Sequence, residues 1–163
     1  IPGQLLYSTF DWGIRDEDGY YFILGRTDDV INVAGHRLGT REIEEAIQGH
    51  SAIAEVAVVG VADQLKGQMP MAFAVVKSAD SIATPELRAA LEKAVMKQVD
   101  DSLGAIARPS RVHFLTVLPK TRSGKIMRRI LRKIAAHEDD SLGDISTLAD
   151  PTVVNELISN RVK

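Results

Sequence analysis

The sequence predicts an α+β fold, an α/β sandwich in which helices flank a small, mostly antiparallel central sheet and a short β-hairpin precedes it. Two features support this fold class. Short runs of apolar and β-favouring residues are bounded by turn residues, and they alternate with segments whose apolar residues recur at helical spacing. The 163 residues are 45% hydrophobic and 26% charged, so the chain can bury a core.

The first third of the chain predicts a small hairpin followed by a helix. Thr40 is a suitable N-cap for that helix, because its hydroxyl can accept a free backbone N–H, and Ile43 and Ile47 fall on one face. The other expected segments are an irregular stretch at 1–18, strands at 20–25 and 30–33 joined by a polar hairpin connection at 26–29, and a loop at 35–39.

The remainder of the chain predicts further strands that alternate with helices. Thr84, Pro85 and Glu86 mark a helix start, since they combine an N-cap, a proline in the first turn and an acidic residue. The other expected segments are strands at 53–61, 71–76 and 111–118, a helix from Ser123, and a last short helix after Asp150 and Pro151.

Composition excludes several classes of site and partner. The chain has no cysteine, which excludes disulfides and thiolate metal sites and fits a reducing compartment, so we expect a cytoplasmic protein. No apolar run approaches the roughly 20 residues needed to cross a membrane, and a net charge of −2 gives no reason to expect a nucleic-acid partner. Because Ile1 opens a stretch typical of the middle of a protein, we expect an N-terminal partner domain.

The segment from Lys120 to Lys133 has seven cations and no anion. Lys125 is expected where a loop becomes the helix that starts at Ser123, and a cation at a helix N-terminus favours a bound phosphate or carboxylate. From charge alone, a solvated basic face stays open as an alternative, and so does a surface for nucleic-acid phosphates. The second is disfavoured because no aromatic residue is interleaved. The nucleotide P-loop pattern is not matched, because its first glycine is missing.

The run Pro119-Lys120-Thr121-Arg122-Ser123-Gly124-Lys125 resembles the C-terminal signature of the adenylate-forming acyl-CoA synthetases, a superfamily that also includes luciferases and nonribosomal peptide synthetase adenylation domains. The resemblance implies that the fold is the mobile C-terminal lid domain of such an enzyme. It also implies that Lys125 is the catalytic lysine of the adenylation step.

Two further motifs follow the order found in that family. Tyr7 to Asp11 resembles Y-x-T-G-D, which implies that Asp11 binds the ATP ribose, although Phe10 stands where glycine is usual. Residues 25–39 resemble the hinge region and the loop after it. By this resemblance, Arg26 and Arg37 contact the nucleotide, Asp28 is the hinge, and Ala34 and Gly35 line the pantetheine channel of CoA.

The resemblance also implies a domain organisation and a reaction. Residues 1–27 would end the N-terminal domain and approach the hinge, 28–136 would form the mobile domain, and 137–163 would be an extension with a short helix. The enzyme would be an AMP-forming acid–thiol ligase that converts a carboxylate, ATP and CoA into acyl-CoA, AMP and diphosphate. Residues 10–19 are similar to propionate–CoA ligases, so propionate is the expected substrate and acetate the runner-up.

Some expectations concern a metal, a modification and partners. The resemblance places a Mg²⁺ site at Gln48, His50 and Ile53, and it implies acetylation of Lys125 by an acetyltransferase, reversed by a deacetylase. The chain alone would be inactive without its own N-terminal adenylation domain. The hypothesis from another class is a stand-alone module that uses 120–133 to bind anions or nucleic acid.

Overall fold

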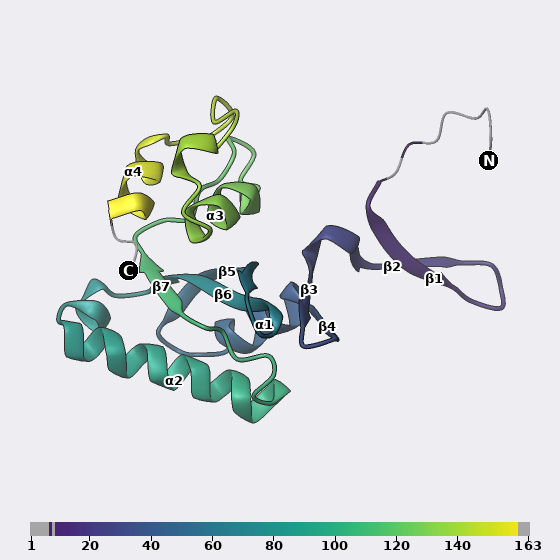
Figure 1. Ribbon diagram of the computed structural model, residues 1–163, viewed down its shortest axis with the longest axis horizontal. Helices are drawn as coiled ribbons and strands as arrows, with labels where there is room; N and C mark the ends of the chain where they lie inside the picture. Colours follow the sequence, from purple (N-terminus) through teal and green to yellow (C-terminus); the bar gives the residue numbers. More distant parts are fainter. Residues whose placement is uncertain (1–6, 8, 160–163) are drawn as a thin grey trace.

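The computed structural model describes residue 7 and residues 9–159, apart from the side chains of residues 24, 25 and 28. Figure 1 shows a β-hairpin standing apart from a larger body of helices and strands. The hairpin pairs β1 (Asp11–Arg15) with β2 (Tyr21–Arg26). No helix in this described part of the chain is both long and apolar enough to span a membrane.

In the described residues, the body contains a five-stranded sheet. The strand order is β4-β3-β6-β5, and β7 pairs with β6 along the edge that β6 also presents to β3. All pairings are antiparallel except the parallel pairing of β6 with β7. The strands are β3 (Val30–Val33), β4 (His36–Gly39), β5 (Ile53–Asp63), β6 (Gly67–Val76) and β7 (Val112–Leu115).

Helices cover both faces of this sheet (Figure 1). One face carries α1 and α2, and the other carries α3 and α4. The α-helices are α1 (Thr40–Gln48), α2 (Pro85–Leu103), α3 (Arg128–Ala135) and α4 (Thr152–Ser159), and short 3₁₀ turns occupy Thr27–Asp29, Ala79–Ile82 and Asp139–Ser141.

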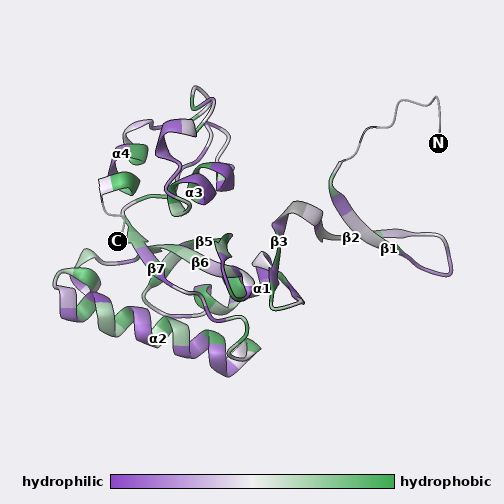
Figure 2. Ribbon diagram, viewed as in Figure 1, coloured by the Kyte–Doolittle hydropathy of each residue, from purple (hydrophilic) through white to green (hydrophobic). Residues whose placement is uncertain are grey.

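The alternation of side chains along β5 divides the interior into two cores. Val56 and Val58 pack with α1 and α2, whereas Ala57 and Val59 pack with α3 and α4. Figure 2 shows hydrophobic colour on the central strands and on α4, while α3 is largely hydrophilic on its visible side. Both faces of the sheet are therefore buried, which explains the nearly continuous apolar run of β5.

Several expected elements are confirmed. The strands at 20–25, 30–33, 53–61 and 71–76 are present with shifts of a few residues at their ends. The Thr84 hydroxyl accepts the Leu87 N–H at 3.3 Å and caps α2 as expected. The last short helix follows Asp150, whose Oδ1 accepts the Thr152 N–H at 2.9 Å.

The N-terminal expectations need two corrections. Residues 1–18 are not irregular throughout, because β1 forms at 11–15 against the distant β2. The connection expected at 26–29 is wrong as well, since β2 and β3 lie in different sheets and Thr27–Asp29 is a 3₁₀ turn between them. Strand pairing is a non-local property, and it overrides the weak strand pattern of β1.

Three further boundaries differ from expectation. The loop expected at 35–39 is mostly β4, because Ala34 (φ 49°) and Gly35 (φ 88°) alone make a tight two-residue turn. The α1 helix begins at Thr40 with Gly39 as N-cap, and Thr40 is buried. The strand expected at 111–118 spans only β7 (Val112–Leu115).

Candidate active site

The loop that carries Lys125 closes on itself through Thr121. The Thr121 N–H donates to the Lys125 carbonyl at 2.8 Å, and the Thr121 carbonyl accepts the Gly124 N–H at 2.8 Å. Thr121 Oγ1 accepts the Lys125 N–H at 3.1 Å and lies 2.9 Å from Ser123 Oγ. The backbone of Lys125 is therefore fixed, while its side chain is exposed and pairs with no other residue of the described part of the chain.

The helix expected from Ser123 begins at Arg128 instead. Gly124 has a φ of 83°, a left-handed conformation that no α-helix contains. Lys120 and Ile126 form an antiparallel bridge across the turn, so residues 120–126 form a closed loop and not the first turn of a helix. Lys125 thus lies before α3 and its N-cap Met127, and the expected position of Lys125 at the start of a helix is wrong.

Two ion pairs hold the base of this loop, and sequence analysis identified neither. The Lys120 ammonium lies 2.8 Å and 2.6 Å from the two carboxylate oxygens of Glu55 on β5. Arg128 Nη2 lies 2.8 Å from both oxygens of Glu44 on α1. The residues on either side of the Lys125 turn are therefore joined to different elements of the body.

The structure brings Asp11 and Arg26 together. They are opposite residues of the hairpin, and Arg26 Nη1 lies 3.8 Å from Asp11 Oδ1. The neighbouring Phe10 has a φ of 60°, and its carbonyl accepts both the N–H and the hydroxyl of Thr27, at 2.6 Å and 3.1 Å. Phe10 thus adopts a conformation that glycine would adopt without strain, which explains why glycine is usual at this position of the motif.

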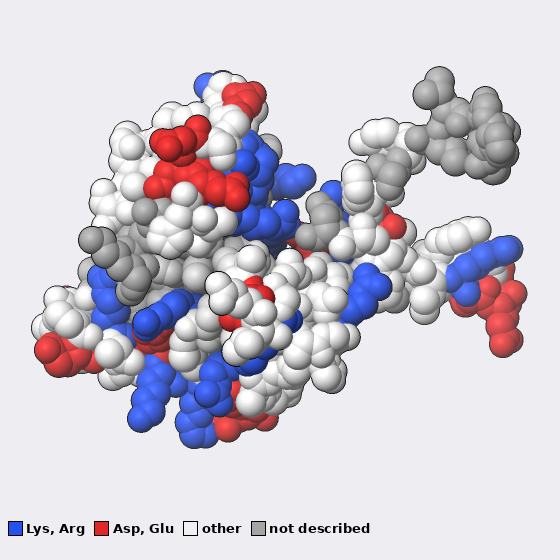
Figure 3. All heavy atoms as spheres, viewed as in Figure 1, with Lys and Arg blue, Asp and Glu red and all other residues white. Residues whose placement is uncertain are grey.

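Arg26 and Arg37 line one open groove of about 1360 Å³, but Lys125 does not line it. The groove runs between the hairpin, which contributes Trp12, and the body, which contributes Arg128. Figure 3 shows basic side chains gathered where the body faces the hairpin. Four arginines and four carboxylates line the groove, so it presents charges of both signs: Arg26, Arg37, Arg41 and Arg128 beside Asp29, Glu42, Glu44 and Glu45.

The Ala34–Gly35 turn lies beside a second turn that ends β5. The Ala34 N–H donates to the Lys66 carbonyl at 2.8 Å, and Val33 pairs with Gly67. A Cβ added at Gly35 would meet no described atom within 4 Å. The positive φ therefore favours glycine at position 35, and crowding within the described part of the chain does not.

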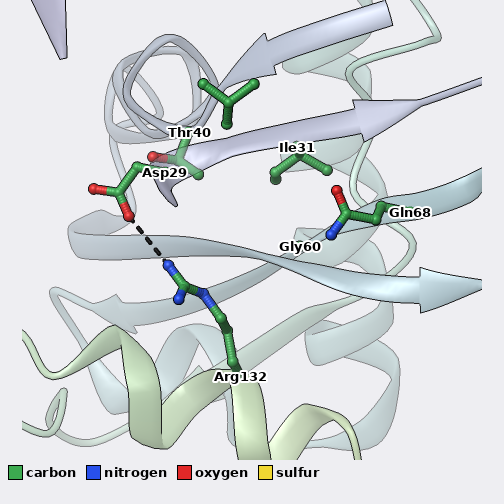
Figure 4. A pocket seen from close by; sticks show the side chains of 7 residues that line it. Asp29, Ile31, Thr40, Gly60, Gln68 and Arg132 are labelled. Atoms are coloured by element: carbon green, nitrogen blue, oxygen red, sulfur yellow. Dashed lines mark hydrogen bonds and ion pairs between the residues drawn. The ribbon is translucent and has the colours of Figure 1, made fainter. Parts of the chain in front are cut away.

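Asp28, the expected hinge, lies in the 3₁₀ turn Thr27–Asp29, but its side chain is outside the described residues. The adjacent Asp29 accepts a hydrogen bond from Arg132 of α3 at 3.2 Å. These two residues line a cavity of about 150 Å³ with Thr40 and Gln68 (Figure 4). The segment after the hairpin is thus tied to the helix that follows Lys125.

His50 has a structural role in the turn after α1. Its Nδ1 accepts the Ala52 N–H at 3.3 Å, and its carbonyl accepts the Ile53 N–H at 3.0 Å. Gln48 is exposed and Ile53 is 1% exposed. Within the described residues, no group of three or more His, Cys, Asp or Glu side chains could hold a metal ion. That finding does not bear on Gln48 and Ile53, so the magnesium site expected at Gln48, His50 and Ile53 stays a prediction.

Large apolar side chains of the hairpin are exposed to solvent. Trp12 is 46% exposed, Phe22 50%, Ile23 69% and Tyr21 74%. Exposed large apolar side chains of this kind are typical of surfaces that bind another protein surface, a membrane or a ligand. Sequence analysis did not identify this feature, because exposure depends on which face the hairpin turns toward the body.

The comparisons with known sequences agree on one family. The sequence profile of the AMP-binding enzyme C-terminal domain matches residues 42–125. Propionate–CoA ligase of Escherichia coli is 55% identical over 152 residues, which are 93% of this chain and 24% of the ligase. Acetyl-coenzyme A synthetase of Aeromonas hydrophila is 56% identical over 161 residues, which are 99% of this chain and 24% of the synthetase. The chain thus spans about a quarter of the length of these relatives.

Solved structures agree with the fold class expected from the sequence. The crystal structure of ATP-bound MatB from Rhodopseudomonas palustris aligns with a TM-score of 0.66 at 30% identity, over 81% of this chain and 24% of that one. The anthranilate CoA ligase AuaEII in complex with anthranoyl-AMP aligns with a TM-score of 0.64 at 35% identity, over 79% of this chain and 24% of that one. The profile match, which covers about half of the chain, and these alignments lead to one conclusion: the chain belongs to the family of AMP-binding enzyme C-terminal domains.

Proposed function

We propose that this chain is the C-terminal catalytic domain of an ATP-dependent, AMP-forming acyl-CoA synthetase. The observation that carries the proposal is the exposed Lys125 side chain, which pairs with no other described residue and stands on a turn whose backbone is held by Thr121. Membership in the family and the identities of the relatives support it. In this proposal residues 1–27 end the N-terminal adenylation domain, 28–136 form the mobile domain, and 137–163 form an extension.

The reaction has two halves. First, a carboxylate oxygen of the substrate forms a bond to the α-phosphorus of ATP, and the bond to diphosphate breaks. The thiol sulfur of CoA then bonds to the carbonyl carbon of the acyl-adenylate, loses its proton, and AMP leaves with the electron pair. Propionate is the proposed acyl substrate and acetate the runner-up, and Mg²⁺ accompanies ATP as part of that substrate.

Lys125 acts in the first half. Negative charge concentrates between the attacking carboxylate and the α-phosphate, so a cation fixed there stabilises the transition state more than the separated reactants. Lysine suits this role because it is a compact charge on a long stem that can reach into a cleft of a neighbouring domain. Asp11 and Arg26, from the hairpin, would hold the ribose and the nucleotide in that cleft, and Arg37 would contact its phosphates.

The second half uses a different face of the domain. Rotation at Asp28 would withdraw Lys125 and present the Ala34–Gly35 turn to the pantetheine arm of CoA. A proline at position 28 fixes φ and should hold the domain in one of its two positions. The hinge assignment is wrong if the Asp28→Pro enzyme keeps both half-reactions.

Acetylation of Lys125 would remove the charge that adenylation needs and so switch the first half off. The exposed side chain is accessible to an acetyltransferase and a deacetylase, and these enzymes together with a cytoplasmic location complete the proposal. Mass spectrometry of the protein purified from cells, with and without deacetylase treatment, tests the modification. An unmodified Lys125 under every growth condition would contradict it.

A fusion experiment tests the proposed function. The chain replaces the matching segment of E. coli propionate–CoA ligase, and formation of propionyl-CoA is compared for the fusion, for the chain alone and for the ligase without that segment. We expect activity only in the fusion. The rival class, a module that binds nucleic acid through 120–133, predicts instead that the chain alone binds DNA with a steep salt dependence.

A further inference from the structure

The Lys125 loop is paired along its outer side with a segment that follows α3 in the sequence. The Arg122 N–H donates to the Thr147 carbonyl at 3.3 Å, and the Ala149 N–H donates to the Lys120 carbonyl at 2.9 Å. Thr121 and Leu148 form an antiparallel bridge between these two contacts. We call residues 145–149 the C-terminal brace. It forms a short ladder of backbone hydrogen bonds with the loop.

The brace is itself fixed to the body. Leu148 is 2% exposed and lies in the core cluster that also contains Leu118 and Ile130. Its N–H donates to the Ile145 carbonyl at 3.0 Å, and the Ser146 N–H donates to Asp144 Oδ1 at 2.8 Å. The brace therefore has a defined shape and a buried anchor.

The helices on either side of the brace reinforce it. Arg129 of α3 donates to the Leu142 carbonyl, and its second nitrogen donates to the Asp144 carbonyl at 2.6 Å. After the brace, Glu156 of α4 accepts the hydroxyl of Thr116 at 2.6 Å and its N–H at 3.1 Å. The chain is thus held on both sides of the brace, by α3 at Leu142 and Asp144 before it and by Thr116 at Glu156 of α4 after it.

These contacts matter because a long side chain is only as well placed as the backbone that carries it. Catalytic groups need placement within about 0.5 Å, and a displacement of about 1 Å can cost about 100-fold in rate. Thr121 closes the turn from within, but that turn has no other backbone partner on its outer side than the brace among the described residues. The brace also lies outside residues 42–125, the part matched by the family profile.

We propose that the C-terminal brace is a positioning element for Lys125 in the adenylation half-reaction, with Leu148 as its anchor. This inference rests on the proposed function of Lys125. It assigns a role in adenylation to residues 145–149, which touch no reacting atom and act through the backbone of 120–122. The thioester half-reaction, from which Lys125 is withdrawn, does not need the brace.

The test uses the fusion with E. coli propionate–CoA ligase and a pair of matched core variants. Leu148 and Leu157 are each 2% exposed in the same core cluster, but only Leu148 lies in the brace. Leu148→Ala and Leu157→Ala are compared for thermal stability and for both half-reactions. These are diphosphate release from propionate and ATP, and propionyl-CoA formation from supplied propionyl-adenylate. Ala149→Pro removes the N–H that donates to Lys120 and also restricts the backbone of the brace, so it perturbs the brace without changing a core side chain.

We expect Leu148→Ala and Ala149→Pro to lower the adenylation rate by about 10- to 100-fold and to leave thioester formation unchanged. Leu157→Ala should lower thermal stability as much as Leu148→Ala but keep adenylation. The inference is overturned if Leu148→Ala and Leu157→Ala lose adenylation equally, if Ala149→Pro keeps it, or if both half-reactions fall together. Lys125→Ala in the same fusion separates the two claims. If that variant keeps adenylation, the proposed function itself fails.

Discussion

Arg128 Nη2 lies 2.8 Å from both carboxylate oxygens of Glu44, and the two side chains are 28% and 14% exposed. Glu44 Oε1 also accepts the N–H of Val58 at 2.8 Å, on the free edge of β5. A single carboxylate therefore covers an open strand edge and fixes the first residue of α3, just after the Lys125 turn. Arg128 Nε is buried and has no hydrogen-bond partner among the described residues, where the contact with Glu44 is the one that holds this side chain.

Replacing Glu44 by alanine should therefore destabilise the fold. The change leaves the Arg128 cation and the Val58 N–H without partners, and we expect the free energy of unfolding to fall by about 1–3 kcal/mol. Urea denaturation measures it. The matched control is Glu45→Ala at the next position of α1, whose pair with Arg41 is exposed on both sides, so this variant should lower the stability much less. Equal effects of the two variants would contradict this account of the Glu44 contact.

The sequence predicted those structural elements that depend on residues close together in the chain. The cap formed by Thr84 and the apolar run of β5 are both present, since each depends on residues close together in the chain. The Glu44–Arg128 and Glu55–Lys120 pairs join residues 84 and 65 positions apart, and no spacing rule links such residues. Sequence analysis therefore identified Lys125 through its motif but missed the contacts that fix it.

The predicted start of the helix at Ser123 was wrong for a related reason. Its apolar spacing is genuine, because Ile130 and Ile134 are buried in α3 as that spacing requires. The start was misplaced because Gly124 has a positive φ and Thr121 closes the turn, and the helical period of the later residues carries no information about either. Similarly, the positive φ of Phe10 follows from the tertiary contact of its carbonyl with Thr27.

Substitutions at three glycines test whether the Lys125 turn serves adenylation and the Ala34–Gly35 turn serves thioester formation. Gly35, Gly104 and Gly124 have φ values of 88°, 84° and 83°, and an added Cβ would meet no described atom within 4 Å at any of them. Alanine should therefore introduce a similar backbone strain of about 1–2 kcal/mol at each site. In the fusion, we expect Gly35→Ala to slow thioester formation and Gly124→Ala to slow adenylation.

Gly104→Ala, at the end of α2, is the control for strain alone and should affect neither half-reaction beyond its effect on stability. Rates of both half-reactions, together with thermal stability, distinguish these outcomes. If all three variants lose the same half-reaction, the losses reflect strain rather than two functional faces.

His113 makes the stability of the body depend on pH. Its ring stacks on Phe73 with centroids 5.2 Å apart, and burial lowers the pKa of His113, with a smaller opposing effect of Glu92 and a further lowering by Arg111. The unfolded chain therefore binds a proton that the folded chain does not, so the free energy of unfolding falls as pH drops below about 6.5. His113→Phe keeps the stacked ring without the titrating group. Urea denaturation across this pH range should show a shallower dependence in the variant, and an unchanged dependence would refute this assignment.

Lys125 is proposed to act in adenylation and not in thioester formation. The most direct measurement of this difference compares Lys125→Ala with Arg122→Ala in the fusion. Arg122 is a neighbouring exposed cation, so it controls for loss of positive charge alone. We predict that Lys125→Ala lowers diphosphate release from propionate and ATP by about 100- to 1000-fold, while propionyl-CoA formation from supplied propionyl-adenylate persists. Arg122→Ala should retain both. Equal loss of the two half-reactions in Lys125→Ala, or adenylation that survives the substitution, would contradict the account.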